Sequence, residues 1–487
     1  MDNQDSTRAP TEGTAGPVSS ERSSLPAFSG APAVNRISEL VADLISATGL
    51  VSADRLALAR SAAGAGSLAR ALADKQPAPA PSLVEPDQAR ASDHAEGAAA
   101  ATDRLVDSLI LQAAEDGATD IHFEPQEDEL LVRVRIDGTL QEAQRLPKRA
   151  GKEVVRRLKE LAGLDLDDER APQQGRIASG AATGRRLDIR IATLPTVEGE
   201  SAVLRLLDRS RRPPRLEELG LSEELTTRLE ALVSVPSTML VVTGPAGSGT
   251  STTLYALLAE ISRPEINVVS VEDAVEHQLP GIKQVQVDEQ AGLTYPAALE
   301  SILHSDPDVL MVGEIRDGET AKITVEAALS GHFVLATLHA NDGPQALGRL
   351  ADLGVEPFLI GSAVSAVLDQ RLARRLCSHC CEMYAPSVEE LIKARVSPEV
   401  AAASDGMVFY RRKGCPRCHQ SGFKGRVGIF QLFLVDDRLQ AFGTTSPSRG
   451  EIERAVVGEG MRTMWDDGLA KVAAGLTSIE ELVRVLG

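Results

Sequence analysis

The clearest pattern in the chain is a series of short aliphatic runs between residues 213 and 370, separated by stretches of helical length. The runs are TMLVVTG, NVVSVED, VLMVGE and FVLATLH, and TTLYALLAEI and TVEAALS are the helical stretches. Strands without polar alternation are typical of parallel sheets whose two faces are covered by helices. The pattern therefore predicts an α/β domain with a parallel sheet.

Residues 101–212 mix helical and alternating patterns. RLVDSLILQAAEDG and KEVVRRLKELAGL are helical, whereas IHFEP, LLVRVRIDG, DIRIATLP and SAVLRLLD are strand-like. Alternation indicates strands with one solvated face, so this region is predicted to be a smaller α+β domain. The Arg-Pro-Pro-Arg sequence at 212–215 is expected to be a hinge into the α/β domain.

The flanking regions are less regular. Residues 1–32 are rich in Ser, Thr, Ala, Gly and Pro and are predicted to be disordered. Residues 33–74 are expected to form a small helical module, and residues 75–100, with PAPAPS, a stiffened linker. A cysteine-bearing segment at 371–427 and a helical region at 428–487 complete the predicted organisation.

Composition narrows the class of protein. The 487 residues are 43% hydrophobic but only 3% aromatic, and 51 basic against 70 acidic residues give a net charge of −19. Such an acidic surface repels phosphate backbones, which disfavours nucleic acid as the main partner. No apolar run approaches the roughly 18 residues of a membrane span, and the first residues lack the apolar stretch of a secretory signal. The expectation is a soluble, cytosolic protein of several domains.

The first aliphatic run leads into a glycine-rich loop that opens a helix. This arrangement favours phosphate, because backbone N–H groups converge and the helix dipole attracts anions. The spacing fits G-x-x-x-x-G-K-[ST] except that Thr250 replaces the lysine, and Ser251 stands where the motif's hydroxyl meets Mg²⁺. The predicted nucleotide-binding residues are Gly244, Pro245, Ala246, Gly247, Ser248, Gly249, Thr250, Ser251 and Thr252.

Thr250 changes the activity to be expected. A threonine does not reach the β- and γ-phosphates, and it carries no charge to offset the charge that develops in phosphoryl transfer. The loss of one such preorganised donor typically costs about 10²–10³ in rate. Two outcomes stay open, a weakened nucleotide site and a site that has lost nucleotide binding.

All five cysteines lie between Cys377 and Cys418. Two C-x-x-C pairs, Cys377 with Cys380 and Cys415 with Cys418, can surround Zn²⁺ with four thiolates and no open position, as in a structural site. The clustering suits a metal site in a reducing compartment better than a disulfide framework. Thiols without metal are the alternative.

From about Asp103 to the C-terminus, the chain resembles the GspE/PulE/PilB-type ATPases of type II secretion and type IV pilus assembly. The shared motifs occur in order: GATDIHFEP, QQGRI, DIRIATLPTVEGE, the glycine-rich loop, VEDAVEHQLPGIKQVQV, SDPDVLMVGEIRD and SGHFVLATLHANDG. The resemblance implies a RecA-like P-loop NTPase core preceded by a PAS-like α+β domain, with a four-cysteine zinc ribbon and C-terminal helices. It also implies ATP, Mg²⁺ and structural Zn²⁺ as cofactors.

The resemblance assigns roles to four acidic residues and one histidine. Glu314 ends VLMVGE at the Walker B position, where a carboxylate can polarise the attacking water or hold hydrated Mg²⁺. Glu272, Asp273 and Glu276 form the acidic box, and His339 is the γ-phosphate sensor. The alternatives are that Glu314 is a solvated glutamate at a strand end, that the acidic box is a polar turn, and that His339 is a core histidine whose hydrogen bonds are satisfied.

Two arginines of the α+β domain complete the implied site. By resemblance, Arg190 and Arg205 reach across a domain or subunit boundary as arginine fingers, a task suited to a permanently charged guanidinium. Surface arginines on a strand are the alternative. Ala274, Ser201 and His304 depart from the family pattern, and the last two each remove a positive charge in or near the nucleotide region.

The implied assembly is a homo-hexamer, or a ring mixed with a paralogue. It is expected to be cytoplasmic, peripheral to the inner membrane and bound to inner-membrane platform proteins, where ATP hydrolysis drives pseudopilus or pilus assembly. The stretch LISATGLVSADRL faintly resembles the family's docking modules, with cyclic dinucleotide binding and a generic spacer as the alternatives. A catalytically silent structural or regulatory subunit is the second hypothesis, supported by Thr250. A nucleic-acid motor is disfavoured by the charge of −19.

Overall fold

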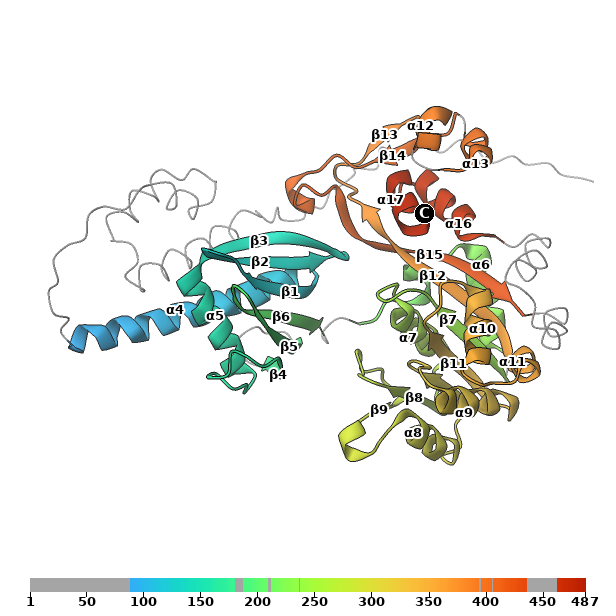
Figure 1. Ribbon diagram of the computed structural model, residues 1–487. Coiled ribbons are helices and arrows are strands. Elements are labelled where there is room, and N and C mark those ends of the chain that lie inside the picture. Colours follow the sequence, from blue (N-terminus) through green and yellow to red (C-terminus); the bar gives the residue numbers. More distant parts are fainter. Residues whose placement is uncertain are drawn as a thin grey trace, which may run out of the picture. The chain divides into compact units, whose positions relative to one another are not determined.

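The computed structural model describes residues 88–179, 187–208, 212–235, 237–393, 396–404, 406–435 and 462–487. The segments predicted at 1–32 and 33–74 lie outside the described residues. The chain divides into two compact units, residues 1–101 and 102–487, and the second contains both large sheets (Figure 1). No helix in the described ranges is long and apolar enough to cross a bilayer.

Helix α4 (Gln88–Glu115) begins inside the segment predicted to be a linker. The sequence HAEGAAAATDRL is rich in alanine, which has the highest intrinsic helix propensity, and this favours the N-terminal extension of the helix. Beyond it, Leu105, Val106, Leu109 and Ile110 are buried along one face of α4. The helix thus contributes an apolar stripe to the core of the α+β domain.

The predicted α+β domain contains a six-stranded antiparallel sheet in the order β3-β2-β1-β6-β5-β4 (Figure 1). Side chains alternate across it, so that Ile189 and Ile191 are buried and Arg190 between them is exposed. Helix α5 (Lys148–Leu161) packs on the buried face through Val154 and Leu158. The strands are β1 (Ala118–Pro125), β2 (Glu129–Ile136), β3 (Thr139–Pro147), β4 (Gln173–Ser179), β5 (Leu187–Thr196) and β6 (Gly199–Asp208).

The parallel sheet predicted for the next domain is confirmed. Seven strands follow the order β15-β12-β7-β11-β10-β8-β9, and all pairs are parallel except β12 with β15. The strands are β7 (Thr238–Thr243), β8 (Val268–Glu272), β9 (Lys283–Gln286), β10 (Val309–Val312), β11 (Phe333–Leu338), β12 (Val364–Leu376) and β15 (Phe423–Leu434).

Two hydrophobic clusters, one on each face, hold this sheet between helices. Strand β7 contributes Met239 and Val241 to one cluster and Leu240 and Val242 to the other, as expected for a strand buried on both faces. The first cluster packs against α8 (Tyr295–Leu303), α9 (Gly318–Leu329), α10 (Gly343–Asp352) and α11 (Pro357–Ala363). The second packs against α6 (Glu223–Val233) and α7 (Thr250–Ile261), and the short 3₁₀ helices are η1 (Leu216–Leu219), η2 (Glu289–Ala291) and η3 (Pro416–Cys418).

Strand β12 continues past residue 370, where the sequence predicts the end of the α/β core. Strand β15 likewise continues past residue 427, the predicted end of the cysteine-bearing segment. Arginines and a glutamine interrupt both strands, so they lack the aliphatic run of β7. Their register runs from Ala366 with Leu434 to Leu376 with Phe423. The intervening chain forms β13 (Glu382–Tyr384), α12 (Val388–Lys393), α13 (Pro398–Ala403) and β14 (Phe409–Arg411).

Two C-terminal helices, α16 (Met464–Ala473) and α17 (Ile479–Leu486), pack on the β12–β15 pair. Glu481 in α17 is only 1% exposed and accepts hydrogen bonds from Arg374 Nη2 at 2.7 Å and Arg484 Nε at 2.9 Å. Burial raises the pKa of this carboxyl, but the hydrogen bonds from Arg484 and Arg374 outweigh it and bring the pKa from 4.5 to about 2. The ionised Glu481 therefore ties the last helix to β12.

We predict that Glu481→Gln lowers the free energy of unfolding at pH 7 by about 3 kcal/mol, since the stabilisation by the ionised carboxylate is lost. That stabilisation is complete above the unfolded-state pKa near 4.5 and disappears as the pH falls toward 2, so the difference from wild type should narrow below pH 5. Thermal unfolding across this pH range measures it. Glu480→Gln, on the exposed side of α17, is the control, and equal effects of both variants would contradict the prediction.

Candidate functional site

Four adjacent parallel strands bring several of the predicted residues to one edge of the seven-stranded sheet. The register of β7 and β11 places Thr243 beside Leu338. The glycine-rich loop follows β7, His339 follows β11, Glu314 lies just after β10, and Glu272 ends β8. Ligands of open α/β sheets bind outside the carboxyl ends of the strands. This edge is therefore the candidate site.

The glycine-rich loop has the backbone shape of an anion site. Gly247 and Gly249 have φ angles of 78° and 89°, in the left-handed region that glycine adopts without strain. Helix α7 begins directly afterwards at Thr250, so the N–H groups of its first turn are available to a ligand. The helix dipole adds a partial positive charge at the same point.

A cavity of about 440 Å³ lies between the start of this loop and the segment that follows β11. His339 shares this cavity with the glycine-rich loop, and its side chain is 57% exposed, so it is not a core histidine. A second cavity, of about 600 Å³, includes Gly249 and Thr252 together with several basic side chains. The residues lining the first cavity are Gly244, Pro245, Ala246, His339, Ala340, Asn341, Gln345, Arg349 and Asp352.

The Glu314 carboxylate lies between the imidazole of His339 and the guanidinium of Arg316. His339 Nε2 lies 2.8 Å from Glu314 Oε1, and Arg316 Nε donates to Oε2 at 2.5 Å. Arg316 also donates from Nη1 to Asp273 Oδ2 at 3.0 Å. The carboxylate is thereby fixed beside His339 at the strand edge, where it can orient a water molecule. Arg316 was not predicted from the sequence, although it lies in the motif SDPDVLMVGEIRD.

Glu272 lies beneath this edge and lines neither cavity. It is 4% exposed, and its Oε1 accepts hydrogen bonds from Ser270 Oγ at 2.6 Å and Gln284 Nε2 at 3.2 Å. The hydroxyl of Tyr255, in α7, donates to Oε2. Three donors on three elements thus surround the carboxylate, which connects β8 with β9 and with the helix after the glycine-rich loop.

Glu276 connects the acidic box with the α+β domain electrostatically. Burial and the charge of Glu272 raise the pKa of the Glu276 carboxyl, and the positive charges of Arg205 and Arg190 oppose this. Both predicted arginines therefore act on the acidic box of the same chain. Arg205 Nε also donates to Asp120 Oδ1 at 3.1 Å.

Arginines stand opposite one another on three neighbouring strands of the six-stranded sheet. The register pairs Arg176 in β4 with Arg190 in β5, and Arg190 with Arg205 in β6. Like charges directly opposite each other destabilise a sheet. Arg176 pairs with Asp188 and Arg205 with Asp120, whereas Arg190 has no acidic partner within the described residues. Arg190 is thus available to an external anion.

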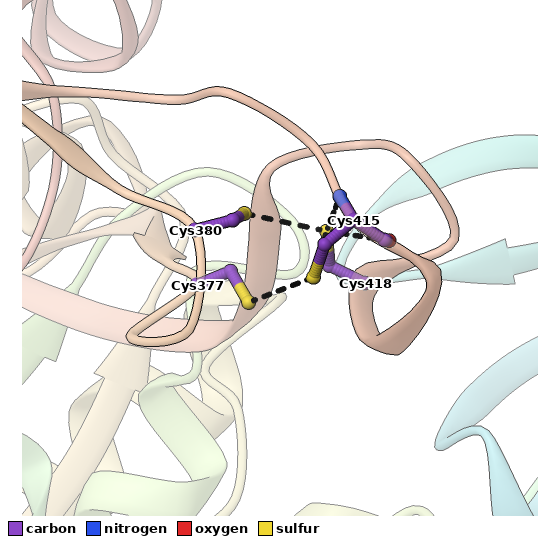
Figure 2. A group of neighbouring side chains, drawn as sticks. All are labelled: Cys377, Cys380, Cys415 and Cys418. Atoms are coloured by element: carbon purple, nitrogen blue, oxygen red, sulfur yellow. Dashed lines mark hydrogen bonds between the residues drawn. The ribbon is translucent and has the colours of Figure 1, made fainter. Parts of the chain in front are cut away.

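The four cysteines of the two C-x-x-C pairs meet at the ends of β12 and β15 (Figure 2). Cys377 Sγ lies 3.9 Å from Cys415 Sγ, Cys380 Sγ lies 3.9 Å from Cys418 Sγ, and all four sulfur atoms lie within 4.8 Å of one another. Sulfur atoms about 2.3 Å from a tetrahedral metal are roughly 3.8 Å apart. The cluster can therefore hold a metal ion.

Backbone N–H groups support the thiolate form of Cys418, whereas burial raises the pKa of Cys380 to about 12. Cys418 Sγ accepts from the N–H of Cys415 at 3.3 Å and of Gly422 at 3.2 Å. Burial raises the pKa of Cys418, but these N–H groups outweigh it and lower the pKa to about 7. A thiolate is the form that binds metal.

The family described as "Type II/IV secretion system protein" matches residues 95–484 of this chain. Type II secretion system protein HxcR of Pseudomonas aeruginosa is 45% identical over 382 residues, which are 78% of this chain and 76% of that protein. Type IV pilus assembly ATPase PilB of Thermus thermophilus is 43% identical over 385 residues, 79% of this chain and 43% of that protein. These similarities cover both sheets and the cysteine cluster.

The fold also occurs in a solved structure of low sequence identity. The ATPase DotB of Legionella pneumophila aligns with a TM-score of 0.55 and 17% identity over 77% of this chain and 93% of that chain. At this identity the likeness concerns the fold alone. The predicted RecA-like fold is confirmed by this alignment and by the parallel sheet.

We predict that Glu272→Ala lowers the free energy of unfolding by about 3 kcal/mol, because the buried hydroxyls of Ser270 and Tyr255 and the half-buried amide of Gln284 lose their acceptor. Asp273→Ala is the matched neighbour, since its ion pair with Arg316 is more than half exposed, and it should cost less than about 1 kcal/mol. Thermal unfolding of the two variants measures the difference. Equal effects would show that the Glu272 contacts do not stabilise the core.

Proposed function

Because the chain belongs to the type II/IV secretion system protein family, we propose that it is an ATP hydrolase of a type II secretion or type IV pilus assembly system. It couples ATP binding and hydrolysis to the assembly of a pseudopilus or pilus. Support comes from relatives named for both kinds of system, of which PilB is named as an ATPase.

The observation that carries this proposal is the convergence of the glycine-rich loop, His339 and Glu314 at one edge of the parallel sheet. The backbone N–H groups of the loop and of the first turn of α7 bind the nucleotide phosphates. Ser251 provides the hydroxyl for Mg²⁺, which neutralises phosphate charge when bound.

Glu314 orients the attacking water in this scheme, and His339 and Arg316 hold its carboxylate in place. His339 lines the cavity at the start of the loop and responds there to the γ-phosphate. Glu272 and Glu276 act from beneath and beside the edge, Glu272 as a buried anchor and Glu276 as the carboxylate that faces the arginines. This division of roles follows from burial.

Positive charge for the transferring phosphoryl group comes from Arg190 and Arg205, since position 250 has none. Arg190 is without an acidic partner within the described residues and stands beside Arg205 on the exposed face of the sheet. We propose a homo-hexameric ring, or a ring mixed with a paralogue, in which this face closes on a nucleotide bound to the core. A ring places a domain of one subunit beside the site of the next.

The cysteine cluster fits structural Zn²⁺ by its four sulfur donors and their spacing. A bound ion joins the ends of β12 and β15 and supplies no open coordination position for chemistry.

The partners we propose are inner-membrane platform proteins of the secretion or pilus machine. The ring would lie at the cytoplasmic face of the inner membrane, where ATP is available. Nucleic acid has no part in this scheme.

The proposal is tested at Thr250. We predict that Thr250→Lys raises Mg²⁺-ATP affinity and raises hydrolysis by about ten-fold or more, because lysine places a charge at the β- and γ-phosphates. Thr250→Arg should raise affinity and hydrolysis less, since the planar guanidinium of arginine is wider than the ammonium group of lysine. Thr250→Met is the control, because the methionine side chain is similar in length to that of lysine but carries no charge. Nucleotide titration and steady-state hydrolysis, with and without single-stranded DNA, measure these effects.

Three results would separate the possibilities. A clear gain in Thr250→Lys alone supports the site as described. A high wild-type rate that the variant does not change means that another cation already provides the positive charge at the phosphates. Arg190 and Arg205 would then be the first residues to test. A rate near zero in both proteins contradicts the ATPase proposal and favours a silent subunit.

We predict about one zinc ion per chain in freshly purified protein. Cys415→Ser should lose the metal, whereas Cys381→Ser, at the fifth cysteine outside the cluster, should keep it. Because the metal stabilises the ribbon, a chelator should expose residues 371–427 to protease first. Elemental analysis without zinc in the wild type would contradict this prediction.

A further inference from the structure

Gln370 lies in β12, the strand that pairs with β7 beside the glycine-rich loop. Its side chain is 2% exposed and makes two hydrogen bonds across a large sequence separation. Nε2 donates to the backbone carbonyl of Ser248 at 2.8 Å, and Oε1 accepts from Thr253 Oγ1 at 2.6 Å. One carboxamide therefore joins the loop to the first turn of α7.

The orientation of this carboxamide follows from its partners. A backbone carbonyl only accepts, so the NH₂ group must face Ser248, and the oxygen then faces the Thr253 hydroxyl. In a trans peptide the C=O and the following N–H point in opposite directions. The bond that draws the Ser248 carbonyl toward Gln370 thus turns the N–H of Gly249 away from Gln370, toward the side where the loop offers its N–H groups.

The loop packs directly on Gln370. A Cβ atom at Gly249 would lie 2.9 Å from Gln370 Nε2, and one at Gly244 would lie 2.4 Å from the backbone oxygen of Gln370. Both distances are shorter than normal van der Waals contact. These two glycines are therefore required by the close approach of β12, apart from any contact with a ligand.

The residues on either side of Gln370 hold the second loop of the site. Asp369 Oδ2 accepts from the N–H of Gly343 at 2.9 Å, and Arg371 Nη2 donates to the carbonyl of Asn341 at 2.6 Å. These contacts fix the segment after β11, which begins with His339. Three consecutive residues of β12 thus hold both sides of the 440 Å³ cavity.

We propose that Gln370 is a positioning residue for phosphate binding, which fixes the peptide between Ser248 and Gly249 so that the Gly249 N–H faces the phosphate. This inference rests on the proposed function, because it assumes that the loop binds nucleotide. Gln370 touches no substrate in this scheme and acts through the loop backbone. Its hydrogen bond to Ser248 is the essential one, and its bond to Thr253 orients the carboxamide.

The test compares variants of the full chain by titration with Mg²⁺-ADP and by steady-state hydrolysis. Gln370→Met keeps the volume but removes both hydrogen bonds, and we expect the Kd and KM to rise at least ten-fold. Thr253→Val removes only the bond to α7 and should change the Kd less than three-fold while it lowers the Tm. A residue with only a structural role would show the same ratio of affinity loss to Tm loss in both variants.

Gln431→Met is the matched control, because Gln431 lies on the adjacent strand β15 and its Oε1 accepts from the N–H of Met464 at 3.1 Å, away from the loop. It should leave the Kd for Mg²⁺-ADP unchanged. The inference is overturned if Gln370→Met binds Mg²⁺-ADP within three-fold of wild type, or if Thr253→Val weakens binding as much as Gln370→Met does.

Amide hydrogen exchange separates this inference from the proposed function. If wild type binds no Mg²⁺-ADP, the proposed function fails, but the role of Gln370 in the loop is still decided without ligand. Faster exchange of residues 246–253 in Gln370→Met, with unchanged exchange in Gln431→Met, supports the positioning role. Unchanged exchange in Gln370→Met overturns it.

Discussion

Backbone pairing of β7 with β11 on one side and β12 on the other is the constraint on which the candidate site depends. Parallel pairing brings the carboxyl ends of β7 and β11 to the same level, so the glycine-rich loop and His339 necessarily meet. Strand β12 adds Gln370 on the side of the loop. Each of these strands is buried on both faces, and a shift of register by one residue would exchange the contents of the two hydrophobic clusters. The packing that stabilises the domain therefore also positions the site.

Charge is distributed in an unusual way around this site. The chain has a net charge of −19, its glycine-rich loop contains no lysine, and Glu272, Asp273, Glu276 and Glu314 lie at or after the ends of β8 and β10. Arg316 pairs with Glu314 and Asp273 on the same sheet, and the charges of Arg205 and Arg190 on the other sheet act on Glu276. Arg349 also lines the cavity beside the glycine-rich loop, so basic side chains of both domains surround the candidate site.

The aliphatic strands, the glycine-rich loop and the paired cysteines could be predicted because each has a local signal in the sequence. Strand β3 could not be predicted because Leu146 is its only buried residue, and β12 and β15 could not be predicted because polar side chains interrupt their apolar runs. The contact of Gln370 with Ser248 has no local signal, since the two residues are 122 positions apart. The burial of Glu272 could not be predicted from the sequence either, because its three hydrogen-bond donors come from separate elements. Sequence patterns report periodicity and spacing, whereas these contacts arise only from tertiary packing.

The position of the cysteine cluster has a consequence for the segment between Cys380 and Cys415. The cluster closes the far end of the β12–β15 pair, and the chain between Cys380 and Cys415 leaves and returns at points that are a few ångströms apart. The entropy cost of closing such a loop grows only slowly with its length. Residues 381–414 are nevertheless not free to vary throughout, because Leu391, Ala401 and Phe409 are buried in the cluster that packs β12 and β15 against the C-terminal helices. Changes in length are therefore best accommodated at its exposed positions, such as Met407 and Val408, where they leave the buried contacts in place.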